Sequence, residues 1–544
     1  MNLVQAISAM GLIALPQLHA ANPVNVAVSE EIPRRPNIVL ILVDDMGFSD
    51  IGCYGSEIPT PNLDALAHGG LRFTQFYNTG RCCPTRATLL TGLYAHQAGV
   101  GHMTDDYGVP GYQGALNDQC VTIGNVASSA GYLSVVTGKW HVGHKQQSMW
   151  PLARGFDRFY GIPEGGGFYF QVKPGRSMVR NNEVVASMEK PLPEGWYSSD
   201  AFVEHGLPFV DEAVAAQQPF LWYLAYNAPH FPLQATAADI ALFRGKYKAG
   251  WDQLSAERYQ RQTAMGLIDD RFPKSQRPEK VAAWESLTTA EQDRFDHMMA
   301  AYAACVYRMD RSVGTLVEEL KTRGQFDNTL ILFMSDNGGC AESGPHGKDV
   351  GDPTTPDSNW FCGESWAWMQ DTPFRKYKHY NHEGGIATPL IAHWPAGISQ
   401  QGAYYTEPAH LIDIMATIAD LSAASYPTEH KGHAIVPMEG VSLKPAFAGE
   451  SLQRDALYWE HEGNAAVREG DWKLVRQGGR GAWELYNLQT DRTEQNNLAS
   501  QHPERLKSLA AKWAAWAARC QVAPHGLPRK SPPKKNGGKK KKAA

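Results

Sequence analysis

The stretch Asn37 to Val43 (Asn-Ile-Val-Leu-Ile-Leu-Val) constrains the fold more than any other part of the chain. An unbroken aliphatic run of this length, without polar alternation, is typical of a strand buried on both faces of a parallel sheet. Similar runs cover Tyr132 to Val136, Leu221 to Tyr226 and Thr329 to Met334. Helical patterns separate them, the longest over Thr289 to Arg323. The sequence therefore predicts an α/β fold with a large mixed, mostly parallel sheet sandwiched by helices.

A different pattern begins after residue 440. Short alternating runs lie between Ala456 and Tyr486, and an amphipathic helix is expected over Pro503 to Cys520. We therefore predict a large domain over 37–440 and a small C-terminal domain over 441–526, built from an antiparallel sheet and a helix. The Gly-rich and aromatic-rich segment Gly155 to Tyr169 is expected to form loops over the sheet edge.

The two ends of the chain differ from its body. Residues 1–21 combine a short apolar stretch with small residues, which predicts a signal peptide, and residues 22–36 are expected to be a linker. Residues 527–544 form a Lys-rich tail, expected to be disordered, whose removal changes the net charge from −5 to −13. The body is thus acidic, and no nucleic-acid partner is expected. No apolar run approaches the roughly 18 residues of a transmembrane segment. Because of the predicted signal peptide, we expect a periplasmic or secreted protein, with the cytoplasm as the alternative.

Polar clusters follow the predicted buried strands. Asp44 and Asp45 come directly after the first strand, and Asp336 and Asn337 follow the strand that ends at Met334. Ligands of open α/β sheets bind beyond the carboxyl ends of strands. Because this set offers only oxygen ligands, it suits a hard cation such as Ca²⁺ or Mg²⁺ and disfavours zinc.

The stretch from Arg81 to Gly92 is predicted to be a short helix, with Pro84 in its first turn and Gly92 at its end. Its N-terminus favours an anion, and Arg86 adds a full positive charge nearby. Cys82 and Cys83 lie at this end. Taken alone, the two cysteines are typical of a buried thiol pair. A phosphatase with a cysteine nucleophile is disfavoured, because its phosphate-binding loop needs more residues between the cysteine and the arginine than are present here.

The spacing Cys82-x-Pro84-x-Arg86, followed by Thr91-Gly92, closely resembles the signature of the type I sulfatases, a family of the alkaline phosphatase-like superfamily. That family usually has Ser where Thr85 stands here. The resemblance implies that a formylglycine-generating or other maturation enzyme converts Cys82 to formylglycine, whose hydrate is the nucleophile. It also implies one Ca²⁺ per active site, held by the following residues: Asp44, Asp45, position 82, Asp336 and Asn337.

Further family positions match in chain order: Lys139 and His141 in Gly-Lys-Trp-His, His230 in Ala-Pro-His, and Lys378 before Glu-Gly-Gly. By resemblance, Asp336 helps deprotonate the nucleophile, while His230, with Lys378 close by, protonates the leaving group. His141 triggers the release of sulfate, and Arg86 and Lys139 hold the site in place.

The substrate implied is a small sulfate ester. Three stretches look most like bacterial arylsulfatases: Thr372 to Arg375, His382 to Pro395 and Tyr458 to Asn464. Some relatives place a Ser near the site where this chain has Gly165-Gly166-Gly167. A phosphonate monoester or phosphodiester hydrolase, or a carbohydrate sulfatase, on the same scaffold is the alternative. A non-catalytic protein of the same fold would need a broken set of site residues, and the set here is complete.

Overall fold

Strand β1 (Asn37–Val43) lies in the main sheet between β7 (Phe220–Ala225) and β8 (Thr329–Ser335), parallel to both. Its odd-numbered residues from Val39 to Val43 join one hydrophobic core, and the even-numbered residues from Ile38 to Leu42 join the other. All of these side chains are fully buried. Since both faces of the strand are covered, an uninterrupted aliphatic sequence is what the position requires.

The computed structural model describes residues 35–523 and 527. The predicted signal peptide, residues 22–34 of the linker, and the tail apart from residue 527 lie outside the described residues. Within residues 35–523, no helix is long and apolar enough to cross a membrane. The described residues pack as one unit, so the boundary expected near residue 440 stays a prediction.

The described part of the chain contains an 11-stranded main sheet in the order β12-β2-β11-β8-β1-β7-β3-β4-β5-β6, with β13 beside β2. Strand β11 is antiparallel to both its neighbours, and β5 and β6 pair antiparallel at the far edge. The remaining pairs are parallel, which confirms the mixed, mostly parallel sheet. Its other strands are β2 (Leu71–Tyr77), β3 (Leu133–Lys139), β4 (Arg158–Ile162), β5 (Met178–Arg180), β6 (Glu183–Ala186), β11 (Ala387–His393), β12 (Tyr404–Tyr405) and β13 (Ala409–His410).

One expectation was wrong. Residues 155–169 were expected to be loops, but Arg158–Ile162 form β4, which is parallel to β3. Gly161 lies so close to β3 that an added Cβ would be 1.9 Å from the carbonyl oxygen of Gly138. A glycine inside a short run lowers its apparent strand propensity, yet here it permits this close backbone approach.

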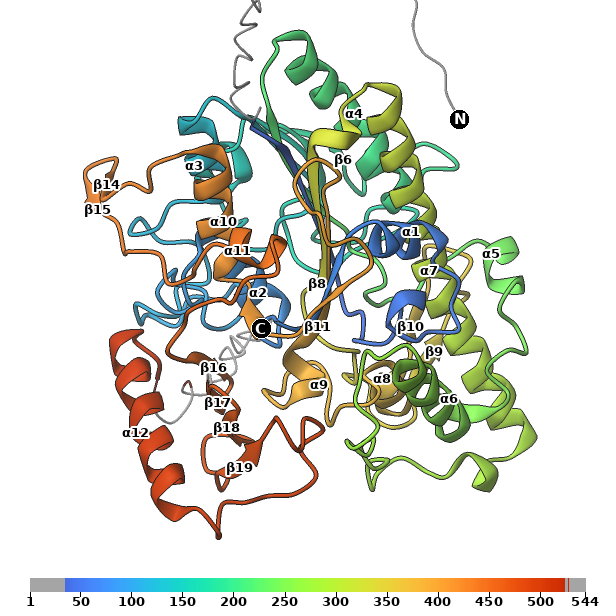
Figure 1. Cartoon of the computed structure of the whole chain (residues 1–544). Coiled ribbons are helices and arrows are strands. Elements are labelled where there is room, and N and C mark those ends of the chain that lie inside the picture. The colour runs from blue at the N-terminus through green and yellow to red at the C-terminus, as the bar shows by residue number, and fades with distance from the viewer. Residues whose placement is uncertain (1–34, 524–526, 528–544) are drawn as a thin grey trace, which may run out of the picture. The chain divides into compact units, whose positions relative to one another are not determined.

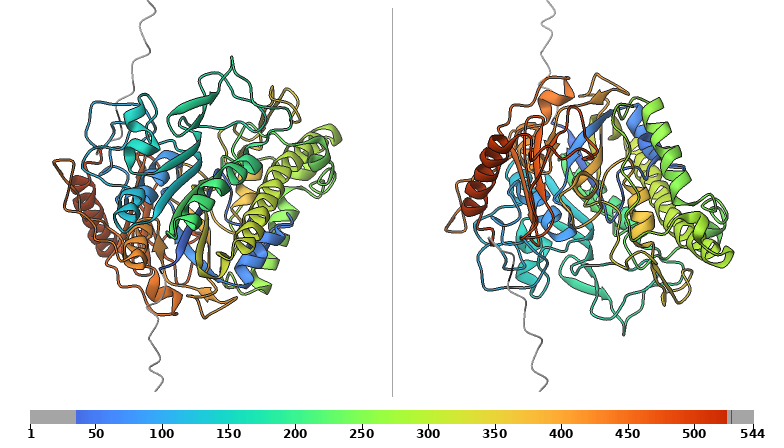
Figure 2. Two further views of the ribbon diagram at one scale, coloured as in Figure 1. Left: turned by 90° about the horizontal axis from the view of Figure 1, so that it is seen from above. Right: turned by 90° about the horizontal axis from the view of Figure 1, so that it is seen from below.

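Helices cover both faces of the main sheet (Figures 1 and 2). Helices α2, α3, α10 and α11 lie on one side, and α1, α4, α5, α6 and α7 lie on the other. The bounds are α1 (Pro61–His68), α2 (Cys82–Thr91), α3 (Ile123–Ser129), α4 (Ser198–Ala215), α5 (Ala237–Ala241), α6 (Gly250–Ala264), α7 (Thr289–Thr322), α8 (Gly363–Gln370), α9 (Glu383–Ile386), α10 (Asp413–Ser422) and α11 (Lys444–Phe447). The predicted sandwich of helices around the sheet is confirmed.

The predicted C-terminal antiparallel sheet is also present. It contains β16 (Leu457–His461), β17 (Asn464–Glu469), β18 (Trp472–Arg476) and β19 (Glu484–Asn487), paired in chain order, and α12 (Pro503–Arg519) packs on it. Two small hairpins complete the strands, β9 (Lys348–Val350) with β10 (Asn359–Phe361) and β14 (Glu429–His430) with β15 (His433–Ala434).

Buried charges join the C-terminal sheet to the rest of the unit. The Lys473 ammonium on β18 lies 2.8 Å from the Glu383 carboxylate of α9 and 2.9 Å from that of Glu494, and all three side chains are fully buried. The Tyr77 hydroxyl at the end of β2 donates to Glu383 at 2.9 Å. The Trp459 indole donates to the carbonyl oxygen of Asn78 at 2.8 Å. The small sheet is therefore anchored to the segments that flank the main sheet's strand ends.

Candidate active site

The predicted site residues converge at one edge of the main sheet. Strands β8, β1, β7 and β3 are consecutive neighbours, and their carboxyl ends lead into Asp336, Asp44, the segment up to His230, and His141. The sheet order, which the sequence does not reveal, thus brings together residues almost 300 positions apart. Lys378 reaches the same place from the loop before α9.

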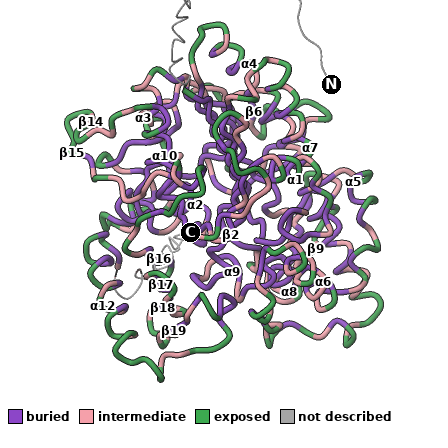
Figure 3. Tube along the Cα trace, in the orientation of Figure 1, coloured by how far each residue is buried: buried purple, intermediate pink, exposed green. Residues whose placement is uncertain are grey.

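Helix α2 begins at Cys82, next to the strand end that carries Asp336. Each of its ten residues is buried, and it ends at Gly92, whose φ of 69° is the left-handed conformation expected of a helix stop. Figure 3 shows α2 among the buried parts of the chain. The Thr85 hydroxyl donates to the carbonyl oxygen of Asp336 at 2.7 Å and accepts from the Thr79 amide at 3.1 Å. Thr85 therefore ties the front of the helix to the end of β8.

Arg86 is neutralised within the site. Its guanidinium lies 3.0 Å from an Asp336 oxygen and 3.4 Å from an Asp44 oxygen, and it donates to the carbonyl oxygen of Lys139 at 2.8 Å. The Lys139 ammonium also contacts Asp44. Although burial opposes it, the charges of Lys139, His230 and Arg86 hold the pKa of Asp44 below its ordinary value. Burial, followed by the nearby Asp44 charge, raises the pKa of Asp336.

Asp45 connects the other side of the site. Its carboxylate lies 2.7 Å from the Lys378 ammonium and 3.5 Å from His230 Nε2, and it accepts from the Asn337 amide at 2.8 Å. The ring of His230 stacks on Phe231, with centroids 4.1 Å apart. Asp45 itself has φ 64°, a left-handed conformation that is uncommon for residues other than glycine and asparagine and that is often found at functional sites.

His141 lies beside the two thiols. One ligand atom from each of Cys82, Cys83 and His141 falls within 4.8 Å of the others. Burial, and next the Lys139 charge, lowers the pKa of His141 to about 4, which makes it a neutral imidazole at pH 7. A hydrogen bond from Cys83 is the main cause that lowers the pKa of the Cys82 thiol, with Lys139 and His141 acting in the same direction. These contacts favour a negative charge at position 82.

Gly165 packs directly against His141. A Cβ added there would lie 1.8 Å from His141 Nε2 and 2.3 Å from its Cδ2. The same loop is bonded to the histidine's backbone, because the His141 amide donates to the carbonyl oxygen of Pro163 at 3.2 Å. The glycine run noted in the sequence therefore leaves room for the imidazole.

The chain's donor set fits a hard cation. Within residues 35–523, Asp44 Oδ1 and Asn337 Oδ1 are buried oxygens with no hydrogen-bond partner. Such atoms are almost always paired in folded proteins. Two unpaired oxygens beside the carboxylates of Asp45 and Asp336 are the ligands that Ca²⁺ or Mg²⁺ takes. The predicted metal residues therefore fit such an ion.

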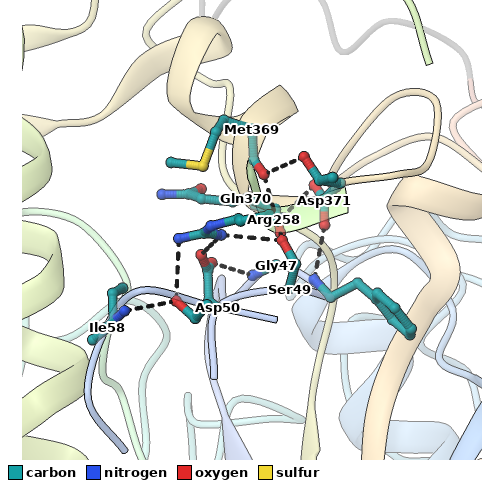
Figure 4. Close-up of polar contacts among 12 residues, drawn as sticks. Gly47, Ser49, Asp50, Ile58, Arg258, Met369, Gln370 and Asp371 are labelled. Atoms are coloured by element: carbon teal, nitrogen blue, oxygen red, sulfur yellow. Dashed lines mark hydrogen bonds and ion pairs between the residues drawn. The ribbon is translucent and has the colours of Figure 1, made fainter. Parts of the chain in front are cut away.

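A buried network supports the loop that carries Asp44 and Asp45 (Figure 4). The Arg258 guanidinium of α6 lies 2.6 Å from an Asp50 oxygen and 3.0 Å from the Ser49 hydroxyl. The other Asp50 oxygen accepts from the Gly47 amide at 2.9 Å (Figure 4). It also accepts from the Tyr302 hydroxyl at 2.7 Å. The same hydroxyl lies 3.4 Å from the carbonyl oxygen of Asp45. Arg258 of α6 and Tyr302 of α7 thereby hold the segment from Asp45 to Asp50 in place.

Sequence reasoning missed four contributors: Arg258, Tyr302, Tyr223 and the contact of Gly165 with His141. Tyr223 points its hydroxyl at Arg86, 3.3 Å away. A buried arginine inside a polar helix carries no local signal. The glycine run alone was visible in the sequence.

Comparisons with known proteins agree with this geometry. The sulfatase family model matches residues 36–424, and the model of the N-sulphoglucosamine sulphohydrolase C-terminal region matches residues 374–514. An uncharacterised sulfatase of Schizosaccharomyces pombe is 33% identical over 532 residues, covering 90% of this chain and 94% of that protein. An arylsulfatase of Klebsiella aerogenes is 32% identical over 440 residues, covering 78% of this chain and 94% of that protein.

Solved structures give the same result. The structure of Ps i-CgsB in complex with k-i-k-neocarrahexaose superposes with a TM-score of 0.67 at 28% identity, covering 91% of this chain and 96% of that one. A phosphonate monoester hydrolase of Agrobacterium radiobacter shares the fold, with a TM-score of 0.56 at 19% identity, covering 92% of this chain and 100% of that one. With its family model, its relatives and its fold in agreement, the chain belongs to the sulfatase family and is a sulfuric ester hydrolase.

Proposed function

We propose that this sulfatase is an arylsulfatase-type enzyme that cleaves a small sulfate monoester to a phenol or alcohol and sulfate. The observation that carries the proposal is the placement of Cys82: a residue at the front of a buried helix, between a neutral imidazole and a set of paired lysines and carboxylates. The similarity to the Klebsiella aerogenes arylsulfatase supports the aryl class. The predicted signal peptide supports a periplasmic or secreted enzyme.

In this proposal position 82 carries formylglycine, made from Cys82 by a maturation enzyme, and one Ca²⁺ is held by Asp44, Asp45, Asp336, Asn337 and position 82. The hydrated aldehyde supplies one hydroxyl as nucleophile and a second whose deprotonation lets sulfate leave, while the cation offsets charge on the sulfate oxygens.

The chain's own residues then have distinct tasks. Asp336, held by Arg86 at 3.0 Å, is the carboxylate placed to take a proton from the nucleophilic hydroxyl. His141, neutral and packed against position 82, is placed to take the proton of the second hydroxyl at a ring nitrogen. His230 Nε2 and the Lys378 ammonium both lie against Asp45, where they can stabilise and protonate the departing oxygen.

Paired cysteine variants test the nucleophile. Cys82→Ala should abolish turnover of 4-nitrophenyl sulfate, because the precursor of the aldehyde is gone. Cys83→Ala should keep most of it, since Cys83 is a buried core residue beside Cys82 and is not the precursor of the aldehyde. Peptide mass analysis of active protein should find an aldehyde at position 82. Equal losses in the two variants, or a free thiol at position 82 in fully active protein, would show that the nucleophile is misassigned.

Metal exchange tests the cation. Chelation should lower turnover, and added Ca²⁺ should restore it, because the ligand set contains only hard oxygen atoms besides position 82. Better recovery with Zn²⁺ than with Ca²⁺ would contradict this assignment.

A carbohydrate sulfate ester is the second candidate substrate. The specific observation is the likeness to Ps i-CgsB, whose structure holds a neocarrahexaose. A panel of nitrophenyl sulfate, sulfated oligosaccharides and a nitrophenyl phosphodiester separates the classes by kcat/KM. Much faster turnover of the phosphodiester than of any sulfate would refute the proposed assignment.

A further inference from the structure

Three histidines and a glutamate meet beside the proposed active site, and none of them has a role in the mechanism proposed above. His461 is the last residue of β16, and Glu462 lies in the turn that leads to β17. His379 follows Lys378 in the loop before α9, and His102 lies in the loop after α2. His102 Nε2 lies 2.7 Å from Glu462 Oε1, and His379 Nδ1 lies 3.4 Å from Glu462 Oε2. We call these four residues the histidine cluster.

His461 occupies the centre of the cluster. Its Nε2 is 3.7 Å from Glu462 Oε1, and its ring stacks on His102 with centroids 5.7 Å apart. The His379 ring stands nearly perpendicular to it, with centroids 5.5 Å apart. One ligand atom from each of His379, His461 and Glu462 lies within 4.8 Å of the others.

The side chain of His461 is fully buried, yet in the part of the chain that the structure describes neither ring nitrogen has a hydrogen-bond partner. A buried polar group left unpaired costs about 1–3 kcal/mol, so native proteins rarely keep one without a ligand. This buried imidazole without a partner indicates that something binds between these side chains.

The chemistry of the cluster differs from that of the acidic site. Imidazole nitrogens with one carboxylate are the ligands of Zn²⁺ and related transition metals, whereas Ca²⁺ prefers oxygen alone. Burial lowers the pKa of both His461 and His379, which keeps their rings neutral as metal ligands must be. A sugar hydroxyl would satisfy one ring nitrogen, but it would not explain why three imidazoles converge on one carboxylate.

We propose that His102, His379, His461 and Glu462 form a second metal site, which takes a transition-metal ion of the Zn²⁺ class. This site is separate from the oxygen-rich one. It joins the C-terminal sheet to the rim of the active site, because the His379 amide donates to the carbonyl oxygen of Gly80 at 2.8 Å, just before α2. The bound ion fixes His379, and through the chain the adjacent Lys378.

Metal titration of the full-length protein tests the site without relying on turnover. Protein saturated with Ca²⁺ is titrated with Zn²⁺ by calorimetry, and Co²⁺ is added in a parallel experiment to read the ligand field from its visible absorption. Crystals soaked in Zn²⁺ give the position of the ion by anomalous scattering. We expect one ion at the histidine cluster and visible Co²⁺ bands typical of nitrogen ligands.

Two ligand variants and one surface control complete the design. Glu462→Gln and His102→Asn change partly exposed side chains, so folding should be kept even if His461→Gln fails to fold. Both should weaken binding by more than the roughly 100-fold that the loss of an outer-shell partner costs. His433→Asn, an exposed histidine of β15, should bind as the unaltered protein does. Unchanged Zn²⁺ affinity and stoichiometry in both ligand variants, or an anomalous peak only at Cys82 or elsewhere, would overturn the proposal.

Discussion

Replacing Gly165 by alanine should displace the His141 imidazole while leaving the protein folded. The added Cβ would lie 1.8 Å from Nε2 and 2.4 Å from Cε1, whereas ordinary van der Waals contact begins at 3.4 Å. Either the ring or the loop must therefore move by more than about 1 Å. The backbones of the loop and of His141 are bonded to each other, because the Pro163 carbonyl oxygen accepts from the His141 amide.

A misplacement of about 1 Å at a catalytic group can cost roughly 100-fold in rate. We expect kcat/KM for a sulfate ester to fall by at least that factor, about 2.7 kcal/mol of transition-state stabilisation. The stability cost should stay within the roughly 1–3 kcal/mol that overpacking brings. Steady-state kinetics together with urea unfolding separates the two effects.

Gly175→Ala is the matched control. No atom lies within 4 Å of its added Cβ, and its φ of 70° penalises alanine through the backbone alone. This variant should lose about 1 kcal/mol of stability and keep its turnover. If folded Gly165→Ala protein were as active as Gly175→Ala protein, His141 would not need its present position and the role given to it would be refuted.

Three further outcomes are expected. Arg258→Met should cost about 3–5 kcal/mol in urea unfolding, because it leaves Asp50 buried without its cation; a loss below 1 kcal/mol would contradict the role of the network. Thr85→Val should lower the free energy of unfolding by about 1–3 kcal/mol, because it removes the hydroxyl that bonds to Thr79 and Asp336. Thr85→Ser keeps both hydrogen bonds and should lower it less. Equal losses in the two variants would show that these hydrogen bonds are not the cause. Burial lowers the pKa of His393 to about 4. The unfolded chain then binds more protons between pH 6.5 and 4, so stability falls by about 3 kcal/mol as pH drops through that window, and His393→Gln should flatten this slope.

The strands that could be predicted are those whose burial is uniform. Asn37 to Val43 was predicted to the residue, because every side chain of β1 faces one of the two cores. Strand β4 was missed, because its pairing depends on Gly138 and Gly161 approaching each other across the sheet. The antiparallel pairing of β11 with β8 could not be predicted either, because a continuous apolar run has the same pattern in a parallel and in an antiparallel strand.

The convergence of the candidate site residues at one edge of the sheet was predictable for a different reason. Asp44, Asp336 and His141 each follow a strand whose end is marked in the sequence, and the cysteine motif pointed to their common partner. Arg258 and the histidine cluster were not predictable, because their partners come from distant segments that only the folded chain brings together. Their roles arise from tertiary contacts rather than from local spacing.

The buried charges that join the C-terminal sheet to α9 limit how this protein can recombine with its relatives. A chimaera whose last hundred residues come from a sulfatase without a basic residue at the position of Lys473 would leave Glu383 without this cation. An unpaired carboxylate in that interior costs about 3–5 kcal/mol, a large part of the stability of a domain. Glu383, Lys473 and Glu494 must therefore be inherited as a set. Exchanging single turns of the small sheet between relatives should disturb the fold less than exchanging the whole C-terminal region.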